Sequence, residues 1–322
     1  MTLNLNVSNP DQIFEAVILG AGISGLTLAH RLSKKTNNFL VVEKSRGIGG
    51  RLATRRDGEN IYDHGAQFYK ISPKHELAFD QMWMSCGLVK NWFTLNEVQY
   101  QTSQKGMTGL AKFLADGKSV DLSREIALIK IENNLVILTC TDQSVIKCQK
   151  LFITAPLPQA VILLERSGFE IPQNIKDVKY AHALVALFEL EDLSDYQLLP
   201  YQEKISDTIF SVSQQNTKFE KNSPTLTVAM TPDWSLENFN SSDEKNLVLI
   251  TVFLQKYLML NGSKLDAVIL KSQLKKWRYS HPINPLTCGY VKLNSQIVLA
   301  GDGFSGGSIN HAVKSGLSIP LD

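Results

Sequence analysis

The chain has 322 residues, a hydrophobic content of 43% and a formal net charge of +2. Its length allows a large buried core and suggests two domains. The small net charge and the lack of a basic tract with interleaved aromatic residues argue against a nucleic-acid binder. The chain also has no run of about twenty apolar residues that would form a transmembrane helix.

The amino terminus and the cysteines indicate a soluble, cytoplasmic protein. Residues 1–12 are polar and lack a basic region followed by an apolar core, so we expect a short disordered lead-in there and no signal peptide. The four cysteines form no CxxC pair and no spacing typical of metal ligation. We therefore expect reduced thiols and no metal site.

The first distinctive segment runs from Glu15 to Glu43. An apolar strand at 16–19 leads into Gly20-Ala21-Gly22-Ile23-Ser24-Gly25, a helical pattern and a second apolar strand at 39–42. This order predicts a βαβ unit that binds a dinucleotide. A glycine turn without a nucleotide is the alternative, because a lone GxGxxG is weak evidence, but here strand, glycines, helix, strand and acid occur in the required order.

Each part of this unit has a chemical role. Gly20 permits the turn off the strand, Gly22 lets the backbone approach a pyrophosphate, and Gly25 lets the helix pack on the sheet. The helix directs free N–H groups and the positive end of its dipole at the phosphates. Glu43 can accept hydrogen bonds from a ribose diol and disfavours a 2′-phosphate, so FAD or NAD is expected rather than NADP.

A loop rich in glycine and arginine follows over residues 44–56. Glycines let a backbone lie against a ligand, and guanidinium groups suit phosphate oxygens. The alternative is a solvated basic loop. Its place directly after Glu43 favours a second clamp on the same dinucleotide, with Lys44, Gly50 and Arg51 as contacts.

The glycine motif, Glu43 and the later Gly-Gly-Arg together resemble the FAD-binding signature of the amine oxidase superfamily. The run Tyr62-Asp63-His64-Gly65-Ala66-Gln67-Phe68-Tyr69, which follows Arg51-Leu52-Ala53-Thr54-Arg55-Arg56, resembles the renalase family, particularly its bacterial members. The resemblance implies that Thr54, Gly65, Ala66 and Gln67 contact the cofactor.

Residues 75–115 resemble a first excursion into a substrate domain and the return from it. The apolar positions of 75–84 predict a short helix, and Trp92, Phe93 and Tyr100 lie in two predicted strands. Residues 106–115 resemble the Gly-Met turn and helix by which amine oxidase chains return to the flavin domain, although an ordinary amphipathic helix fits equally well.

The next segment predicts a hairpin and then the exit from the flavin domain. Residues 125–131 and 135–140 flank Asn133-Asn134, a dipeptide that tolerates positive φ. By resemblance, the backbone of Ile126 meets the adenine. Residues 151–159 predict a buried strand broken by prolines, similar to the Pro-x-Pro-Gln turn of renalases.

From about 163 to 286 the pattern changes. Strands are predicted at 183–188, 208–212 and 225–230, and a helix at 246–260. Because strands and helices do not alternate, a mixed or antiparallel sheet is expected. Lys276-Trp277-Arg278-Tyr279-Ser280-His281-Pro282 resembles the Trp-Arg-Tyr segment of bacterial renalases. The alternative is a sheet strand with Trp277 and Tyr279 packed on one face.

The chain then returns to the nucleotide domain. An apolar strand at 297–300 ends at Gly301-Asp302, a glycine-rich turn follows, and a helix starts near Ile309. In flavoproteins this layout lets the aspartate contact the ribityl chain or pyrophosphate, while the helix dipole stabilises negative charge at the pyrimidine end of the flavin. The motif favours FAD over NAD, with Gly301, Asp302, Ile309, Asn310 and Ala312 as cofactor contacts.

The fold that these observations imply is α/β, a Rossmann-like FAD-binding domain with an inserted α+β substrate domain built on a mixed or antiparallel sheet. It is of the amine oxidase and p-hydroxybenzoate hydroxylase type. The FAD-binding domain is expected at 1–70, 105–162 and 287–322, and the substrate domain at 71–104 and 163–286. Non-covalent FAD is expected, because the flavin-facing C-terminal motif has no cysteine to form a thioether.

The renalase resemblance implies an FAD oxidase that takes hydride from misreduced 2- or 6-dihydro forms of NAD or NADP and passes the electrons to O₂, giving NAD(P)⁺ and hydrogen peroxide. The alternatives are amine oxidation and a non-catalytic flavin-binding or redox-sensing protein. Seven residues are candidates for the substrate pocket: His64, Gln67, Tyr69, Trp277, Arg278, Tyr279 and His281. His64 is the weakest of them, because a histidine beside Asp63 suits a satisfied structural pair.

Overall fold

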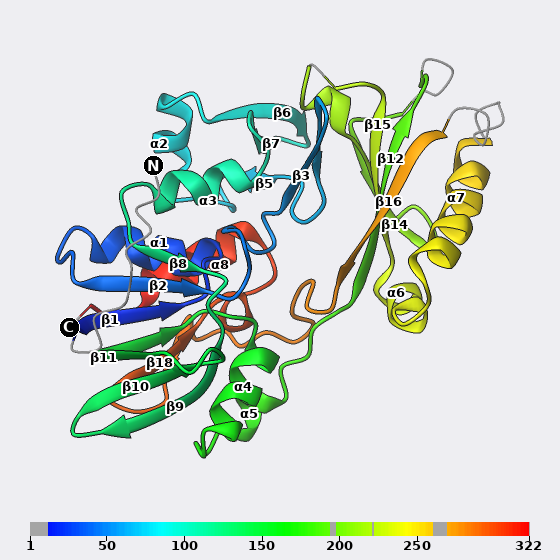
Figure 1. The fold of residues 1–322 in the computed structure, drawn as a ribbon. Helices are drawn as coiled ribbons and strands as arrows, with labels where there is room; N and C mark the ends of the chain where they lie inside the picture. Colours follow the sequence, from blue (N-terminus) through cyan, green and yellow to red (C-terminus); the bar gives the residue numbers. More distant parts are fainter. Residues whose placement is uncertain (1–11, 194–197, 221, 260–268, 322) are drawn as a thin grey trace.

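The computed structural model describes residues 12–193, 198–220, 222–259 and 269–321 (Figure 1). The expected lead-in therefore lies outside the described residues, apart from Gln12. Within the described ranges, no helix combines the length and apolar content needed to cross a bilayer.

The larger sheet has a parallel centre. Its main path runs β17 (Tyr290–Lys292), β18 (Ile297–Ala300), β11 (Val145–Ile153), β1 (Ile13–Leu19), β2 (Phe39–Glu43) and β8 (Val120–Leu122). The last five of these strands pair in parallel, and β17 is antiparallel to β18. The hairpin of β9 (Ile126–Glu132) and β10 (Leu135–Cys140) extends β11 in the antiparallel direction. Such a centre must be covered on both faces, which explains the near-continuous apolar sequence of β1 and β2.

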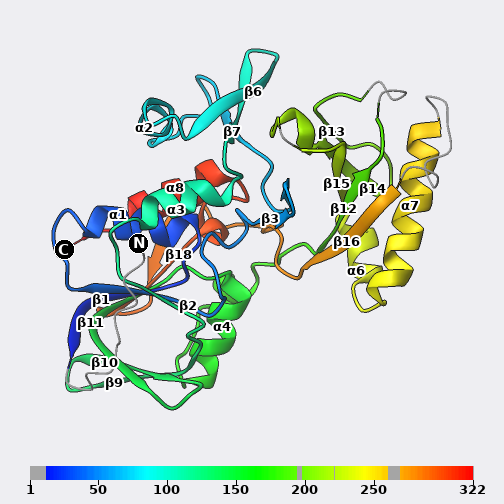
Figure 2. The same cartoon turned by 45° about the horizontal axis from the view of Figure 1, so that its top comes forward.

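Two layers cover this sheet (Figure 2). On one face lie α1 (Ile23–Leu32), α3 (Thr108–Ala115) and α8 (Ile309–Ser318), whose apolar side chains form one core cluster with the strands. On the other face, α4 (Leu157–Arg166), α5 (Gln173–Lys176) and the β9–β10 hairpin form a second cluster. The result is a layered Rossmann-like unit, as the sequence predicted.

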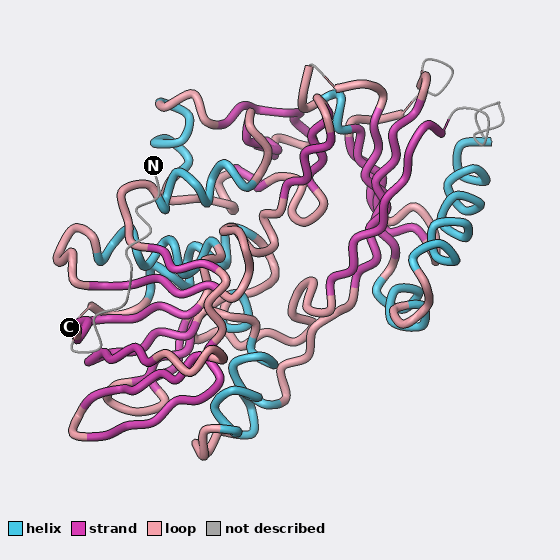
Figure 3. The backbone as a smooth tube through the Cα atoms, in the orientation of Figure 1, coloured by secondary structure: helices cyan, strands magenta, loops and turns pink. Residues whose placement is uncertain are grey.

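A second, five-stranded sheet is antiparallel throughout (Figure 3). Its order is β13 (Tyr201–Glu203), β14 (Ile209–Gln214), β15 (Thr225–Met230), β12 (Ala183–Leu190) and β16 (Ile269–Trp277). The helices α6 (Pro232–Asn238) and α7 (Asp243–Met259) cover one face. On the other face, Val185 and Leu187 pack with Tyr62, Ala183, Ala229 and Trp277.

Smaller elements lie between the two sheets. One is the hairpin of β3 (Thr54–Asp57) and β4 (Asn60–Asp63), and another is the sheet β5 (Tyr69–Ile71), β7 (Val98–Ser103) and β6 (Val89–Leu95). The helix α2 (Asp80–Ser85) and the short 3₁₀ turns η1 (Gln215–Thr217) and η3 (Asp302–Phe304) complete the described elements that concern the site. Tyr69, Phe79 and Trp83 join the core cluster of α1 and α3. The proposed division into domains stays a prediction.

Three of the predicted elements differ from the structure. The strand expected at 151–159 ends at Ile153, and residues 157–159 form the first turn of α4, which accepts a proline near its start. The helix expected at 75–84 begins only at Asp80, because Ser72 and His75 exchange backbone hydrogen bonds in a tight turn. The helix expected at 246–260 begins earlier, at Asp243, and Leu260 lies outside the described residues.

The strand alternative for 276–282 is also wrong beyond Trp277, where β16 ends. Past that point the backbone of Ser280 and His281 bonds to Ala181 in the connection that leads into β12. Residues 278–281 thus form part of the crossing between the two large sheets (Figure 1).

Candidate active site

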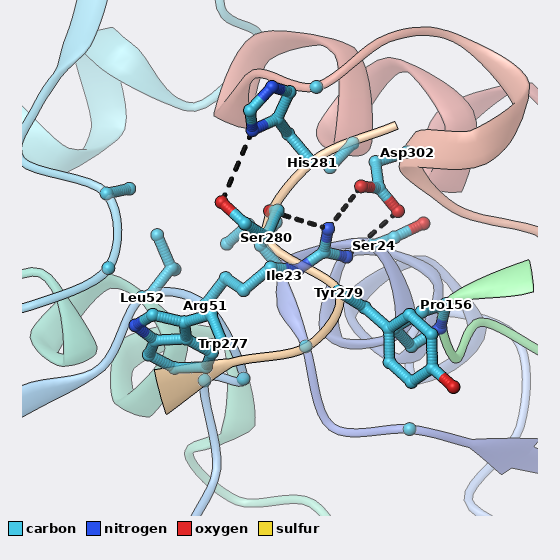
Figure 4. A pocket seen from close by; sticks show the side chains of 18 of the residues that line it. Ile23, Ser24, Arg51, Leu52, Pro156, Trp277, Tyr279, Ser280, His281 and Asp302 are labelled. Atoms are coloured by element: carbon cyan, nitrogen blue, oxygen red, sulfur yellow. Dashed lines mark hydrogen bonds and ion pairs between the residues drawn. The ribbon is translucent and has the colours of Figure 1, made fainter. Parts of the chain in front are cut away.

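A cavity of about 1240 Å³ is lined from both large sheets. One side is formed by the carboxyl ends of β1, β2 and β11, and the other by β12, β15 and the end of β16. In open α/β sheets, ligands bind at the carboxyl ends of the strands. The cavity is therefore the candidate active site, and Figure 4 shows part of its lining.

The glycine motif shapes one end of the cavity. A Cβ on Gly25 would lie 2.2 Å from the carbonyl oxygen of Gly20 and 2.6 Å from the hydroxyl oxygen of Thr154, so the close contact of α1 with the turn requires glycine. Gly22 is different, since no heavy atom apart from its chain neighbours lies within 4 Å of a Cβ built there. Its backbone lines the open cavity, where a ligand can approach closely.

The start of α1 has the features of an anion site. No side chain caps the helix at Gly22, and the hydroxyl of the buried Ser24 has no hydrogen-bond partner. Both Ser24 and Ile23 line the cavity. Uncapped N–H groups, a helix dipole and an unpaired hydroxyl together suit phosphate oxygens.

Glu43 joins the glycine motif to the strand that follows it. One carboxylate oxygen accepts the N–H of Ala21 at 2.9 Å, and the other accepts the N–H of Ser45 at 2.9 Å. A carboxylate has about four acceptor positions, so two remain for hydroxyl groups of a ligand. This geometry agrees with the expected role of Glu43 at a ribose.

The second glycine loop lies directly against the first. Gly49 donates its N–H to the carbonyl of Ala21 at 2.8 Å, and Gly22 and Gly49 form an isolated parallel bridge. From this loop Arg51 forms an ion pair with Asp302 and donates to the carbonyl of Ser280 at 3.2 Å (Figure 4).

Asp302 is held from two directions. Besides its ion pair with Arg51, it accepts a hydrogen bond from the hydroxyl of Tyr180 at 3.0 Å. The turn that contains Asp302 leads into α8, where Ser308 caps the helix by accepting the N–H of His311. All four residues of the first turn line the cavity: Ile309, Asn310, His311 and Ala312.

His64 and Trp277 form a stacked pair on the cavity wall. Their ring centroids are 5.4 Å apart with an interplanar angle of 27°, and the indole N–H donates to the His64 carbonyl at 2.9 Å. Burial, followed by the charges of Lys275 and Arg55, lowers the pKa of His64 to about 4, so the ring is neutral at pH 7. The Asp63 carboxylate bonds to Lys218, and a structural pair of His64 with Asp63 is not formed.

The other candidate pocket residues differ in their surroundings. The Tyr69 hydroxyl donates to Asp80 at 2.8 Å, and its ring is buried. Arg278 is exposed, with its guanidinium 5.4 Å from the ring centroid of Phe239. Tyr279 packs edge-on against Tyr180, with ring centroids 6.0 Å apart.

All seven candidate pocket residues line the cavity. Of the expected cofactor contacts, Ala21, Gly25, Thr54 and Gly301 do not line it. Thr54 lies behind the wall, where its hydroxyl donates to Asp63 at 2.7 Å. The remaining expected contacts do line it: Gly20, Gly22, Ile23, Ser24, Glu43, Lys44, Gly50, Arg51, Gly65, Ala66, Gln67, Ile126, Asp302, Ile309, Asn310 and Ala312.

Sequence reasoning missed several residues around the cavity. His182 lines the cavity from the crossing into β12, and Tyr201 and Phe210 line its far end, at β13 and β14. Tyr180, in the same crossing, does not line the cavity but holds Asp302 through its hydroxyl. Lys218 lies behind Gln67 and is fully buried. No local motif marks these residues, because their partners come from distant parts of the chain.

Two family models match the chain. The model of the NAD(P)-binding Rossmann-like domain matches residues 18–83. The model of flavin containing amine oxidoreductases matches residues 71–319, which is more than half of the chain. The glycine motif, Ser24 and the start of α8 fit the flavin that the second model implies.

Solved structures of related fold cover 94% of this chain. They include a protein provisionally named protoporphyrinogen oxidase from Exiguobacterium sp. 255-15, with a TM-score of 0.72, 13% identity and 97% of its own length covered. A redesigned putrescine oxidase gives 0.69, 14% and 97%, and an oxidoreductase from Methanosarcina mazei gives 0.64, 13% and 99%. At these identities the likeness shows the fold alone.

A shorter match exists to a curated protein named as a possible lysine-specific histone demethylase 1 of Drosophila melanogaster. The two are 40% identical over 52 residues, which are 16% of this chain and 6% of that protein. The chain thus matches only a small part of that relative.

Proposed function

We propose that this protein is an FAD oxidase of the renalase type. The proposal starts from the family: the chain belongs to the flavin containing amine oxidoreductase family and is a flavin-dependent oxidoreductase. In this proposal the substrate is a misreduced 2- or 6-dihydro form of NAD or NADP, and O₂ is the electron acceptor.

The proposed cofactor is FAD, bound without a covalent link. The start of α1 with Ser24 would hold the pyrophosphate, Glu43 the ribose hydroxyls and Ile126 the adenine. The dipole at the start of α8 would favour negative charge at the pyrimidine end of the flavin. The described residues that line the cavity include no cysteine, which supports a flavin held without a thioether.

The charge of the lining is the observation that carries the choice of substrate. Among the described lining residues, the carboxylates are Glu43, Glu125 and Asp302. Glu43 and Glu125 lie at the β2 and β9 end, and Asp302 is paired with Arg51. The part lined by β12, β15 and the crossing to β16 has no carboxylate and carries the cation Arg278. Such a surface suits a phosphate-bearing substrate and disfavours a cationic amine.

The volume of the cavity supports a second large ligand. A pocket for one small ligand has roughly 300–1,000 Å³, whereas this cavity has about 1240 Å³. The lining from β12, β15 and the end of β16 lies outside the part formed by the glycine motif and Glu43, which supports a place for a substrate on the side of the antiparallel sheet. A dinucleotide substrate uses that space better than a small amine does.

The reaction in this proposal is dihydronicotinamide dinucleotide plus O₂ plus H⁺ giving the oxidised dinucleotide and H₂O₂. When bound, FAD supplies the hydride acceptor and the means of reducing O₂. The chain holds the substrate ring and excludes water, for which the flat wall of His64 and Trp277 is suited. Loss of hydride from an already reduced ring needs no strong base, which agrees with a neutral His64 that lacks a carboxylate partner.

Amine oxidation is the second candidate function. The family description favours it, and the aromatic side chains of Tyr201 and Phe210 line the far end of the cavity. A neutral amine could pack between such rings. The part of the lining on the side of the antiparallel sheet has no carboxylate and carries Arg278, so it opposes the protonated amine that predominates at neutral pH.

Anaerobic mixing tests the proposal. The purified holoprotein is mixed with 2- and 6-dihydro-NAD(P), with normal NAD(P)H and with a panel of amines, while flavin absorbance is recorded. Rapid bleaching by the dihydro isomers alone is the expected result. Bleaching by amines alone would instead assign amine oxidation, and flavin that stays oxidised with every compound would indicate a binding or sensing protein.

A further inference from the structure

Lys218 is the one lysine or arginine side chain in the described ranges that is buried, and both it and its partner Asp63 are 0% exposed. Its ammonium group bonds to the Asp63 carboxylate at 3.3 Å, to the Gln67 carbonyl at 2.8 Å and to the Gln67 side-chain oxygen at 2.9 Å. It also lies 4.5 Å from the ring centroid of Trp92. Three acceptors match the three donors of a protonated lysine.

The protonated form is consistent with the surroundings. Burial lowers the pKa of Lys218 to about 8, and the charge and hydrogen bond of Asp63 act in the opposite direction. Each contact partner of the amine nitrogen is an acceptor, so the group must donate to all three. Lys218 is therefore a buried cation at neutral pH.

Both polar atoms of the Gln67 side chain form hydrogen bonds within this network. Its oxygen accepts from Lys218 and from Gln215, each at 2.9 Å, and its amide nitrogen donates to the carbonyls of Asp63 at 2.6 Å and Gly65 at 3.2 Å. Because lysine only donates, the atom that faces Lys218 must be the oxygen. All four hydrogen-bonding positions are then occupied, which leaves none for a substrate.

The same segment is fixed from the opposite side by Arg51. The Ala66 N–H donates to the Arg51 carbonyl at 2.9 Å, and a Cβ on Gly65 would lie 2.0 Å from that oxygen. Residues 65–67 line the cavity and are held between Arg51 on one side and Lys218 on the other. Arg51 in turn pairs with Asp302, the first residue of η3.

We propose that Lys218 is a positioning residue that acts through Gln67 to hold residues 65–67 in place at the bound flavin. Gln67 then supports the cofactor site and does not bind the substrate. The inference rests on the proposed placement of FAD beside residues 65–67, and it is independent of which substrate is oxidised.

Stability alone does not account for this buried cation. A buried ion pair replaced by apolar groups of similar shape is often neutral or more stable, because desolvation offsets the attraction. An apolar side chain at position 218 could fill the same space, but it could not bond to both oxygens of Gln67. Besides its ion pair with Asp63, Lys218 makes two contacts that an apolar side chain could not replace, and both are with Gln67.

The test uses apoproteins of three variants, Lys218→Met, Gln67→Met and the double variant, titrated with FAD. We expect each single change to raise the dissociation constant of FAD about tenfold, and the double change to raise it no further, because both remove the same interaction. The absorbance spectrum of bound FAD should shift alike in all three. These readouts need no turnover.

Lys276→Met is the matched control. Lys276 also contacts one carboxylate, that of Asp243, and two carbonyls, those of Phe239 and Ser241, but it does not line the cavity. FAD affinity and spectrum should stay as in the wild type. If Lys218→Met fails to fold, Gln215→Leu removes a neutral donor to the same Gln67 oxygen and should raise the dissociation constant about threefold.

Three results would overturn the inference: lower stability of Lys218→Met with unchanged FAD affinity and spectrum, additive effects in the double variant, or no binding of FAD by the wild type. The last would also overturn the proposed cofactor. A wild type that binds FAD but does not oxidise dihydronicotinamides would refute only the proposed substrate.

Discussion

His64 stacks on Trp277 with its Nδ1 buried and without a partner, so a proton on this ring would have no carboxylate to stabilise it. The nearby cations Lys275 and Arg55 oppose protonation further. This explains why the ring is neutral and suits a wall that contacts an uncharged ring. It also excludes His64 as a general acid at neutral pH.

The pKa of His64 predicts a pH dependence of stability. The pKa falls from 6.5 to about 4 on folding, so between these values the unfolded chain binds a proton that the folded chain does not. The free energy of unfolding should therefore decrease as pH falls through this window, by about 3 kcal/mol from this group. Above pH 6.5 both states are neutral and the contribution is constant.

Denaturant titrations of wild type and His64→Phe between pH 4 and pH 7.5 measure this contribution. Phenylalanine keeps a flat ring against Trp277 and cannot titrate. The free energy of unfolding of the variant should fall less steeply below pH 6.5. Parallel curves for the two proteins would contradict the assigned pKa.

At the scale of elements, the turn from β1 into α1 separates two kinds of glycine. Gly25→Ala would bring its Cβ within 2.2 Å of the Gly20 carbonyl, whereas Gly22→Ala meets no atom within 4 Å apart from its chain neighbours. We expect Gly25→Ala to lower the free energy of unfolding of the apoprotein by about 1–3 kcal/mol, as overpacking does. Gly22→Ala should change it by less than about 0.5 kcal/mol.

Flavin binding should rank the same two variants differently. Because the Gly22 backbone lines the cavity, its methyl group would meet the ligand and weaken FAD binding although the apoprotein remains stable. Chemical unfolding of the apoproteins and FAD titration measure the two effects separately. Unchanged FAD affinity in Gly22→Ala would show that the pyrophosphate does not lie against this turn.

Elements with a complete local pattern could be predicted from the sequence. The predicted strand at 225–230 matches β15, and the pair at 125–131 and 135–140 matches β9 and β10, with Asn133 and Asn134 at positive φ. These rest on apolar runs and turn residues that are close in sequence. The end of β16 at Trp277 could not be predicted in this way. It depends on the Ser280 N–H, which donates to the Ala181 carbonyl, and on the His281 carbonyl, which accepts the Ala181 N–H.

At the scale of the whole molecule, the site consists of two parts with different predictability. The proposed cofactor end could be predicted from motifs, since the glycines, Glu43 and Asp302 have a spacing that can be recognised. The network of Lys218 could not be found, because Lys218 and Asp63 are 155 positions apart and the sequence around Lys218 looks like an ordinary polar loop. Long-range partners of this kind come only from the fold.

The distribution of charge over the whole cavity leads to a prediction for Arg278. It lies on the carboxylate-free side, and no ion pair to a carboxylate is found for it in the described ranges. If the substrate bears phosphates, Arg278→Gln should raise KM for the dihydronicotinamide dinucleotide about tenfold, the value of one charge-assisted hydrogen bond, and change kcat little. The rise of KM with ionic strength should also become weaker, because one screened attraction is lost.

Lys276→Gln is the control for this substitution. It removes a positive charge two positions away in the sequence, but the Lys276 ammonium is bound to Asp243 and does not line the cavity. Steady-state kinetics at several salt concentrations should therefore leave this variant like the wild type. Equal effects of both substitutions on KM would mean that substrate binding depends only on the net charge of the molecule. An improved KM for amines in Arg278→Gln, with no change for dinucleotides, would instead assign this end of the cavity to an amine.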